Sequence, residues 1–132
     1  MRILIFIWDI RKTFILQYMY PLKPDHRKLR SMLEIVEVLR SIGAQPVFYI
    51  TPLDIETGQT YLPGRFRQRI HKNIELVTAL LRSQNVEPFD LSECLSASDF
   101  AWTRFPNEHL NQDGRSRVAD CLAEIVQNHA ER

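Results

Sequence analysis

The fold of this chain is decided by the stretch QPVFYIT, Gln45–Thr51, which is bounded by a glycine-containing turn and a proline. Its continuous apolar, β-branched and aromatic residues predict a strand that is buried on both faces. Two other segments, Arg2–Trp8 and Val86–Leu91, have the same character and predict two further strands. Pro88 favours an edge position or a late start for the last strand, because proline cannot donate a ladder hydrogen bond.

Helical patterns separate these strands, with apolar residues recurring at i, i+3, i+4 and i+7. The predicted helices are Asp25–Gly43 with Asp25 as N-cap, Gly64–Arg82, and a last one that begins near Asn111 or Asp113. Ile10–Tyr20 is either a helix of its own or a partly exposed apolar segment. Strands that alternate with amphipathic helices indicate βαβ units. We therefore expect a three-layer, flavodoxin-like α/β domain with a short parallel sheet of about three strands flanked by helices.

Length and composition restrict the protein class. The chain has 132 residues, so we expect one domain over 1–132. Lys and Arg total 17 against 16 Asp and Glu, and this balance argues against a nucleic-acid partner. The apolar run within Arg2–Trp8 is too short for a membrane span and has no signal-peptide pattern, so we expect a cytoplasmic protein.

The two cysteines carry no motif. Cys94 and Cys121 lie far apart in the sequence, without CxxC spacing or a nearby histidine. They are typical of small buried thiols in a reducing compartment, and we expect no metal and no cofactor.

Ligands of open parallel sheets bind at the carboxyl ends of the strands. By this rule the candidate site residues lie at Asp9, within Thr51–Asp54 and within Asp90–Glu93. His109 closes the long connection 92–110 directly before the last helix, where a histidine can act as a general base over the strand ends.

The block His109-Leu110-Asn111-x-x-Gly114, followed by a final helix, resembles the last block of the SGNH, or GDSL-type, hydrolase superfamily. Upstream, Ile42–Pro52 is similar to the penultimate helix–strand passage of that superfamily, and Asn85–Ser92 is similar to its next strand. The pair Asp99-Phe100 is similar to the branch involved in O-acylation and D-alanylation of cell-envelope polymers. The resemblance covers residues 29–126.

This resemblance implies ester or O-acyl hydrolysis or transfer. It implies His109 as the base and Asp99 as its partner, with Thr51, Trp102 and Asn111 contacting a small acylated or carbohydrate ligand.

The departures from the superfamily pattern bear on catalysis. The chain has no Gly-Asp-Ser motif, and no serine follows its first predicted strand. Asp9, a hydrogen-bond acceptor, lies at the end of that strand, and Pro106 occupies the usual place of the catalytic acid. A triad without these parts has little activity. We expect a truncated or catalytically degenerate relative that corresponds to the C-terminal part of the superfamily fold.

Two other functions compete with this interpretation. The first is a haloacid-dehalogenase-like phosphatase with Asp9 as nucleophile and with Thr13 and Thr51 in its site, although Arg11 would occupy the general-acid position. The second is a non-catalytic α/β module for protein interaction. Its contact surface would be the basic cluster Arg65, Arg67, Arg69, His71 and Lys72.

A five-stranded fold needs about 150 residues in βα units, so we expect the front strands of the superfamily fold to have no counterpart within these 132 residues. The flank of the predicted strand Arg2–Trp8 is then an open edge. Proteins usually pair or cover such edges. We expect a homodimer that pairs through this strand, or a cover formed by Ile10–Tyr20.

Overall fold

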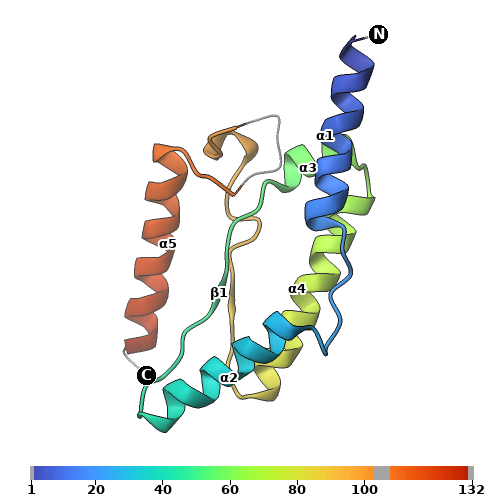
Figure 1. Ribbon diagram of the computed structural model, residues 1–132. Coiled ribbons are helices and arrows are strands. Elements are labelled where there is room, and N and C mark those ends of the chain that lie inside the picture. Colours follow the sequence, from blue (N-terminus) through green and yellow to red (C-terminus); the bar gives the residue numbers. More distant parts are fainter. Residues whose placement is uncertain (1, 103–107, 131–132) are drawn as a thin grey trace.

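A computed structural model describes residues 2–102 and 108–130 (Figure 1). Five helices, a two-stranded sheet and a short 3-10 helix follow one another along these residues. Their order is α1 (Arg2–Tyr18), α2 (Arg27–Ser41), β1 (Tyr49–Ile50), α3 (Ile55–Tyr61), α4 (Arg65–Ser83), β2 (Phe89–Asp90), η1 (Ala97–Asp99) and α5 (Gln112–Ala130).

The sheet consists of β1 and β2, which pair in parallel with Tyr49 opposite Phe89 and Ile50 opposite Asp90. The expectation of an α/β chain with a parallel sheet is confirmed. The sheet is smaller than expected: it has two strands and not three, and only two residues of each form ladder pairs. Figure 1 shows α5 on one side of the strands and α1, α3 and α4 on the other.

The predicted strand Arg2–Trp8 is wrong, because this segment is the first half of α1. Farther along the helix, Ile10 and Phe14 are buried one turn apart and pack against α3 and α4. Ile10 and Phe14 can lie on one buried face only if the chain is helical there. This tertiary packing overrides the strand propensity of the apolar residues at the beginning of α1. A helix has no open ladder groups, so residues 2–8 form no strand edge through which the expected homodimer could pair. The alternative of a helix within Ile10–Tyr20 is confirmed up to Tyr18.

The main core lies where α1, α3 and α4 meet. Its buried residues are Ile10, Phe14, Ile55, Leu62, Phe66 and Ile70. The rings of Phe14 and Phe66 meet edge to face with centroids 5.4 Å apart, a favourable aromatic geometry. A smaller cluster of Val36, Leu81 and Val86 holds α2 against the end of α4.

The helices expected from periodicity are present, with one change at a cap. The ring Nδ1 of His26, and not the carboxylate of Asp25, caps α2 by accepting a hydrogen bond from the Lys28 amide at 3.3 Å. Gly43 follows the end of α2 with φ +78°, which favours glycine. No helix in the described ranges is long and apolar enough to cross a membrane.

Helix α3 had no predicted counterpart. Its sequence IETGQTY has weak helix propensity and includes Gly58. A Cβ at Gly58 would lie 2.2 Å from the ring of Phe66, so glycine permits this close contact between α3 and α4. Asp54 caps the helix by accepting the Thr57 amide hydrogen bond at 3.0 Å.

Candidate functional site

The candidate site lies at the carboxyl ends of β1 and β2. The loops that leave the two strands are joined by a hydrogen bond from the Leu53 amide to the Ser92 carbonyl, 3.0 Å long. The chain after β2 continues through η1 to the start of α5, and this corner contains Asp99, His109 and Asn111.

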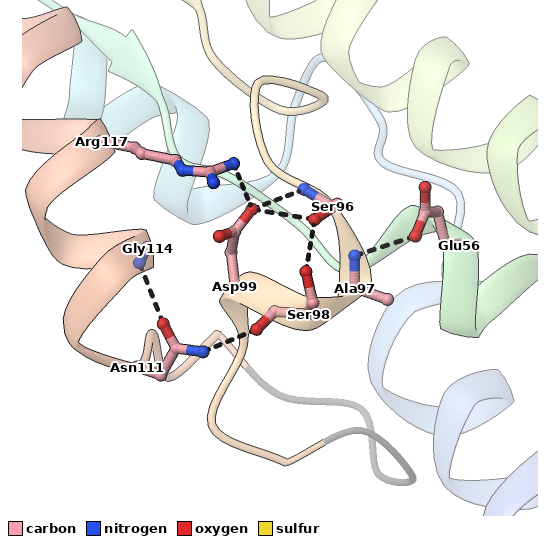
Figure 2. A network of polar contacts seen from close by, with 8 residues as sticks. All are labelled: Glu56, Ser96, Ala97, Ser98, Asp99, Asn111, Gly114 and Arg117. Atoms are coloured by element: carbon pink, nitrogen blue, oxygen red, sulfur yellow. Dashed lines mark hydrogen bonds and ion pairs between the residues drawn. The ribbon is translucent and has the colours of Figure 1, made fainter.

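The Asp99 side chain forms both hydrogen bonds and an ion pair in this corner. It is 2% exposed, and Oδ2 accepts hydrogen bonds from the Ser96 amide and the Ser96 hydroxyl, both at 3.0 Å. Arg117 of α5 lies 3.3 Å from the same oxygen (Figure 2). The Ser96 amide above all, with the Ser96 hydroxyl and the Arg117 charge, lowers the pKa of Asp99. Asp99 is therefore an ionised carboxylate that joins η1 to α5.

Asn111 is the N-cap of α5, a role that follows from its two amide contacts. Its Oδ1 accepts a hydrogen bond from the Gly114 amide at 2.9 Å, and its Nδ2 donates to the Ser98 carbonyl at 2.6 Å (Figure 2). Its backbone amide donates to the Asp99 carbonyl at 3.0 Å. Asn111 thus connects the first turn of α5 to Ser98 and Asp99, the last two residues of η1.

Gly114 is buried against this segment. A Cβ at this position would lie 2.3 Å from the Asp99 carbonyl oxygen, a distance that no side chain tolerates without movement. The pattern Asn111-x-x-Gly114 therefore has a direct structural meaning: the asparagine caps the helix and the glycine lets the helix approach the chain. The Ala97 amide also donates to Glu56 of α3 at 2.9 Å, which joins this corner to the strand-end side of the core.

His109 lies on the surface of the same corner. Its carbonyl accepts a hydrogen bond from the Ala101 amide at 2.8 Å, next to the antiparallel bridge between Phe100 and Leu110. Its ring meets the ring of Trp102 edge to face with centroids 5.1 Å apart. Trp102 is 56% exposed, so the two rings form an accessible aromatic surface. Pro106 lies outside the described residues.

A cleft of about 420 Å³ adjoins the end of β1. Its apolar floor includes Ile50, Leu53 and Ile70. Its polar wall residues include Tyr18, Tyr20, His26, Asn73 and Glu108. A cleft of this volume is large enough for a small organic ligand.

Two of these wall residues have defined polar roles. Burial, and after it the neighbouring Glu108 carboxylate, raise the pKa of Tyr18 to about 12, so its hydroxyl stays a donor at neutral pH. Asn73 holds the chain between α1 and α2, because its Oδ1 accepts from the Leu22 amide and its Nδ2 donates to the Tyr20 carbonyl, both at 3.0 Å. The cleft is thus built from segments far apart in the sequence.

The residues of the phosphatase alternative do not meet at the strand ends. Asp9 and Thr13 lie one turn apart in α1, where the Thr13 hydroxyl donates to the Asp9 carbonyl at 3.0 Å. The expected position of Asp9 at the end of a strand is therefore wrong, since the segment before it is helical. Thr51 follows β1 as expected and is exposed.

Asp54 ends the strand-end segment Thr51–Asp54, and its capping role and its burial were not predicted. It is 5% exposed, and its Oδ2 has no hydrogen-bond partner among the residues that the structure describes. Burial raises the pKa of Asp54, against the opposing hydrogen bonds from Thr57. The signal that could have found this cap is an aspartate, a preferred N-cap residue, placed directly before the apolar Ile55.

The cysteines differ from expectation in their exposure. Cys94 is exposed and Cys121 is half-buried, and both are free thiols. Burial of part of the side chain, together with the neighbouring Cys121, raises the pKa of Cys94. Within residues 2–102 and 108–130, no three His, Cys, Asp or Glu side chains gather into a group that could hold a metal ion.

Comparison of the chain with protein-family models, with curated proteins and with solved structures found no match.

Proposed function

We propose that this protein is an SGNH-like α/β domain that binds an O-acylated or carbohydrate ligand and does not hydrolyse it. The observation that carries the proposal is the use of Asp99 and Asn111 in the corner between η1 and α5. Asp99 accepts hydrogen bonds from Ser96 and forms an ion pair with Arg117, and Asn111 caps α5. Because these contacts hold the fold, Asp99 is not available as the partner of a base at His109, and Asn111 is not available as a ligand contact.

The parallel pair β1–β2 and the corner before α5 support the SGNH-like part of the proposal. The cleft of about 420 Å³ at the end of β1 supports a binding role, because open parallel sheets bind ligands there. Its wall combines aromatic rings with the Tyr18 hydroxyl and the Glu108 carboxylate, a mixture suited to a hydroxylated ligand.

The catalytic half of the proposal is tested by the hydrolysis of 4-nitrophenyl acetate. We expect equal, background-level rates for the wild type and for His109→Ala. An esterase rate that is well above background in the wild type and is lost in His109→Ala would contradict the proposal, since it would make His109 a working base.

The binding half is tested by saturation-transfer NMR with an acetylated xylo-oligosaccharide. Tyr20 lines the cleft, whereas Tyr49 is a comparably exposed tyrosine of β1 that is not among the wall residues. We expect Tyr20→Ala to weaken binding by up to roughly tenfold and Tyr49→Ala to leave it unchanged. Equal effects of the two substitutions, or no binding by the wild type, would contradict a ligand site in this cleft.

A further inference from the structure

The basic cluster at the start of α4 divides into two groups with different surroundings. Arg67 and His71 lie one helical turn apart, and both contact the Glu93 carboxylate, at 3.2 Å and 2.5 Å. These two side chains therefore have an acidic partner within the protein. Arg65, Arg69 and Lys72 follow a different line along the helix, at i, i+4 and i+7 spacing.

Arg65, Arg69 and Lys72 line a small cavity of about 90 Å³, together with Gln68 and with Met19, which directly follows α1. A single water needs about 10–15 Å³ of such space, so the cavity has room for a tetrahedral oxyanion. Arginine and lysine donors along one face of α4 match the oxygens of such an ion.

The positive charge of the residues that line this cavity is not neutralised by a nearby carboxylate. No carboxylate lies among its lining residues, and no ion pair joins any of its three cations to another described residue. Arg69 Nε is buried and has no acceptor in the described part of the chain. Solvent does not reach this nitrogen, so an anion would act through the charges that line the cavity, where it would reduce the repulsion between the three cations.

The side chains, and not the helix N-terminus, make this site. The amides of Arg65 and Phe66 already donate to the Leu62 carbonyl, and the Arg67 amide donates to Gln59 Oε1 at 3.1 Å. The first turn of α4 therefore has few free amides to offer an anion.

We propose that Arg65, Arg69 and Lys72 form a binding site for a phosphate-type oxyanion, either the free ion or the phosphate group of a phosphomonoester. The site is separate from the cleft at the strand ends and does not depend on the function proposed for it. Gln68 adds a neutral donor, and Met19 closes the cavity on the side of α1.

The test is calorimetric titration of the full chain with inorganic phosphate in a low-salt buffer. We expect one site in the wild type and a loss of affinity of about tenfold or more in Arg69→Gln. The matched control is Arg30→Gln, which removes the same charge from an exposed position of α2, and we expect less than a twofold change.

The contrary results are equally clear. Absence of phosphate binding to the folded wild type, or an equal weakening by Arg30→Gln, would overturn the proposal, because the second result indicates only an effect of net charge. Should Arg69→Gln fail to fold, Arg65→Gln and Lys72→Gln replace exposed side chains and test the same prediction.

A parallel titration with glucose 6-phosphate distinguishes the two sources of the ligand. Tighter binding of the ester, lost in the same variants, assigns the site to phosphomonoesters. Equal or tighter binding of the inorganic ion assigns it to free phosphate.

Discussion

At Gly114 the first turn of α5 touches the backbone of the chain at Asp99, with no room for a methyl group. The Cβ of an alanine would lie 2.3 Å from the Asp99 carbonyl oxygen. We expect Gly114→Ala to lower the free energy of unfolding by about 1–3 kcal/mol, because backbone must move to relieve the overlap.

Urea unfolding followed by circular dichroism measures this change. The control is Ser116→Ala, an exposed position of the same helix, which we expect to alter stability by less than about 0.5 kcal/mol. A Gly114→Ala variant that is as stable as the control would show that the helix and the chain do not touch here.

Asp54 links stability to pH. Burial raises its pKa, so the folded protein holds this proton to a higher pH than the unfolded chain does. The unfolded state thus binds fewer protons between the ordinary aspartate pKa and the raised value, and stability from this group falls as pH rises through that window. We expect Asp54→Asn to remove this fall, since asparagine keeps the capping oxygen without the charge.

The measurement is the free energy of unfolding of both proteins from about pH 3 to pH 6. Asp99 acts in the opposite sense: its pKa is lowered, and its contribution is lost as pH falls through the folded value. The difference between wild type and Asp54→Asn isolates Asp54. An unchanged pH profile in the variant would argue against a buried, unpaired carboxylate.

Among the elements, η1 and α5 are joined in part by the side chain of Asn111. Asn111 caps α5 through the Gly114 amide and holds the Ser98 carbonyl through its own amide group. We expect Asn111→Ala to cost about 1 kcal/mol, the usual loss for a removed cap. Asn111→Asp keeps the capping oxygen and loses the donor to Ser98, so we expect a smaller cost. An alanine variant as stable as the wild type in chemical denaturation would refute the capping role.

Helix α1 shows why a local pattern can be misleading. Its apolar, β-branched start is compatible with a strand or with a helix, and periodicity alone cannot separate the two in so short a run. Phe14 resolves the choice in the folded protein, because its ring packs between Tyr61 and Phe66. These partners lie about fifty residues away in the sequence, so a pattern within α1 alone cannot predict the contact.

At the scale of the whole molecule, the core is concentrated on one side of the sheet. The described hydrophobic clusters join α1, α3 and α4, and α2 to the end of α4. The apolar residues Val118, Leu122 and Ile125 of α5 are only half-buried, and its main contacts are with η1. We expect amides in the middle of α5 to exchange with deuterium faster than those in the middle of α4.

Hydrogen–deuterium exchange read by mass spectrometry on peptides from the two helices measures this difference. Asn111→Ala should widen it further by loosening the start of α5. Equal protection of α4 and α5 in the wild type would contradict this unequal distribution of stability.

The sequence by itself determined the helices α2, α4 and α5 and the parallel strand pair, because amphipathic periodicity and the ends of helices are local properties of the chain. It also pointed to Asp99, His109 and Asn111 as residues of one corner. Only the tertiary structure decided that α1 is a helix and that the Asp99 carboxylate binds Ser96 and Arg117. It also decided that one part of the basic cluster pairs with Glu93, whereas the other part lines a cavity without a carboxylate. Each of these depends on which surfaces meet across the fold, and burial and charge pairing between distant residues are settled by packing rather than by local sequence.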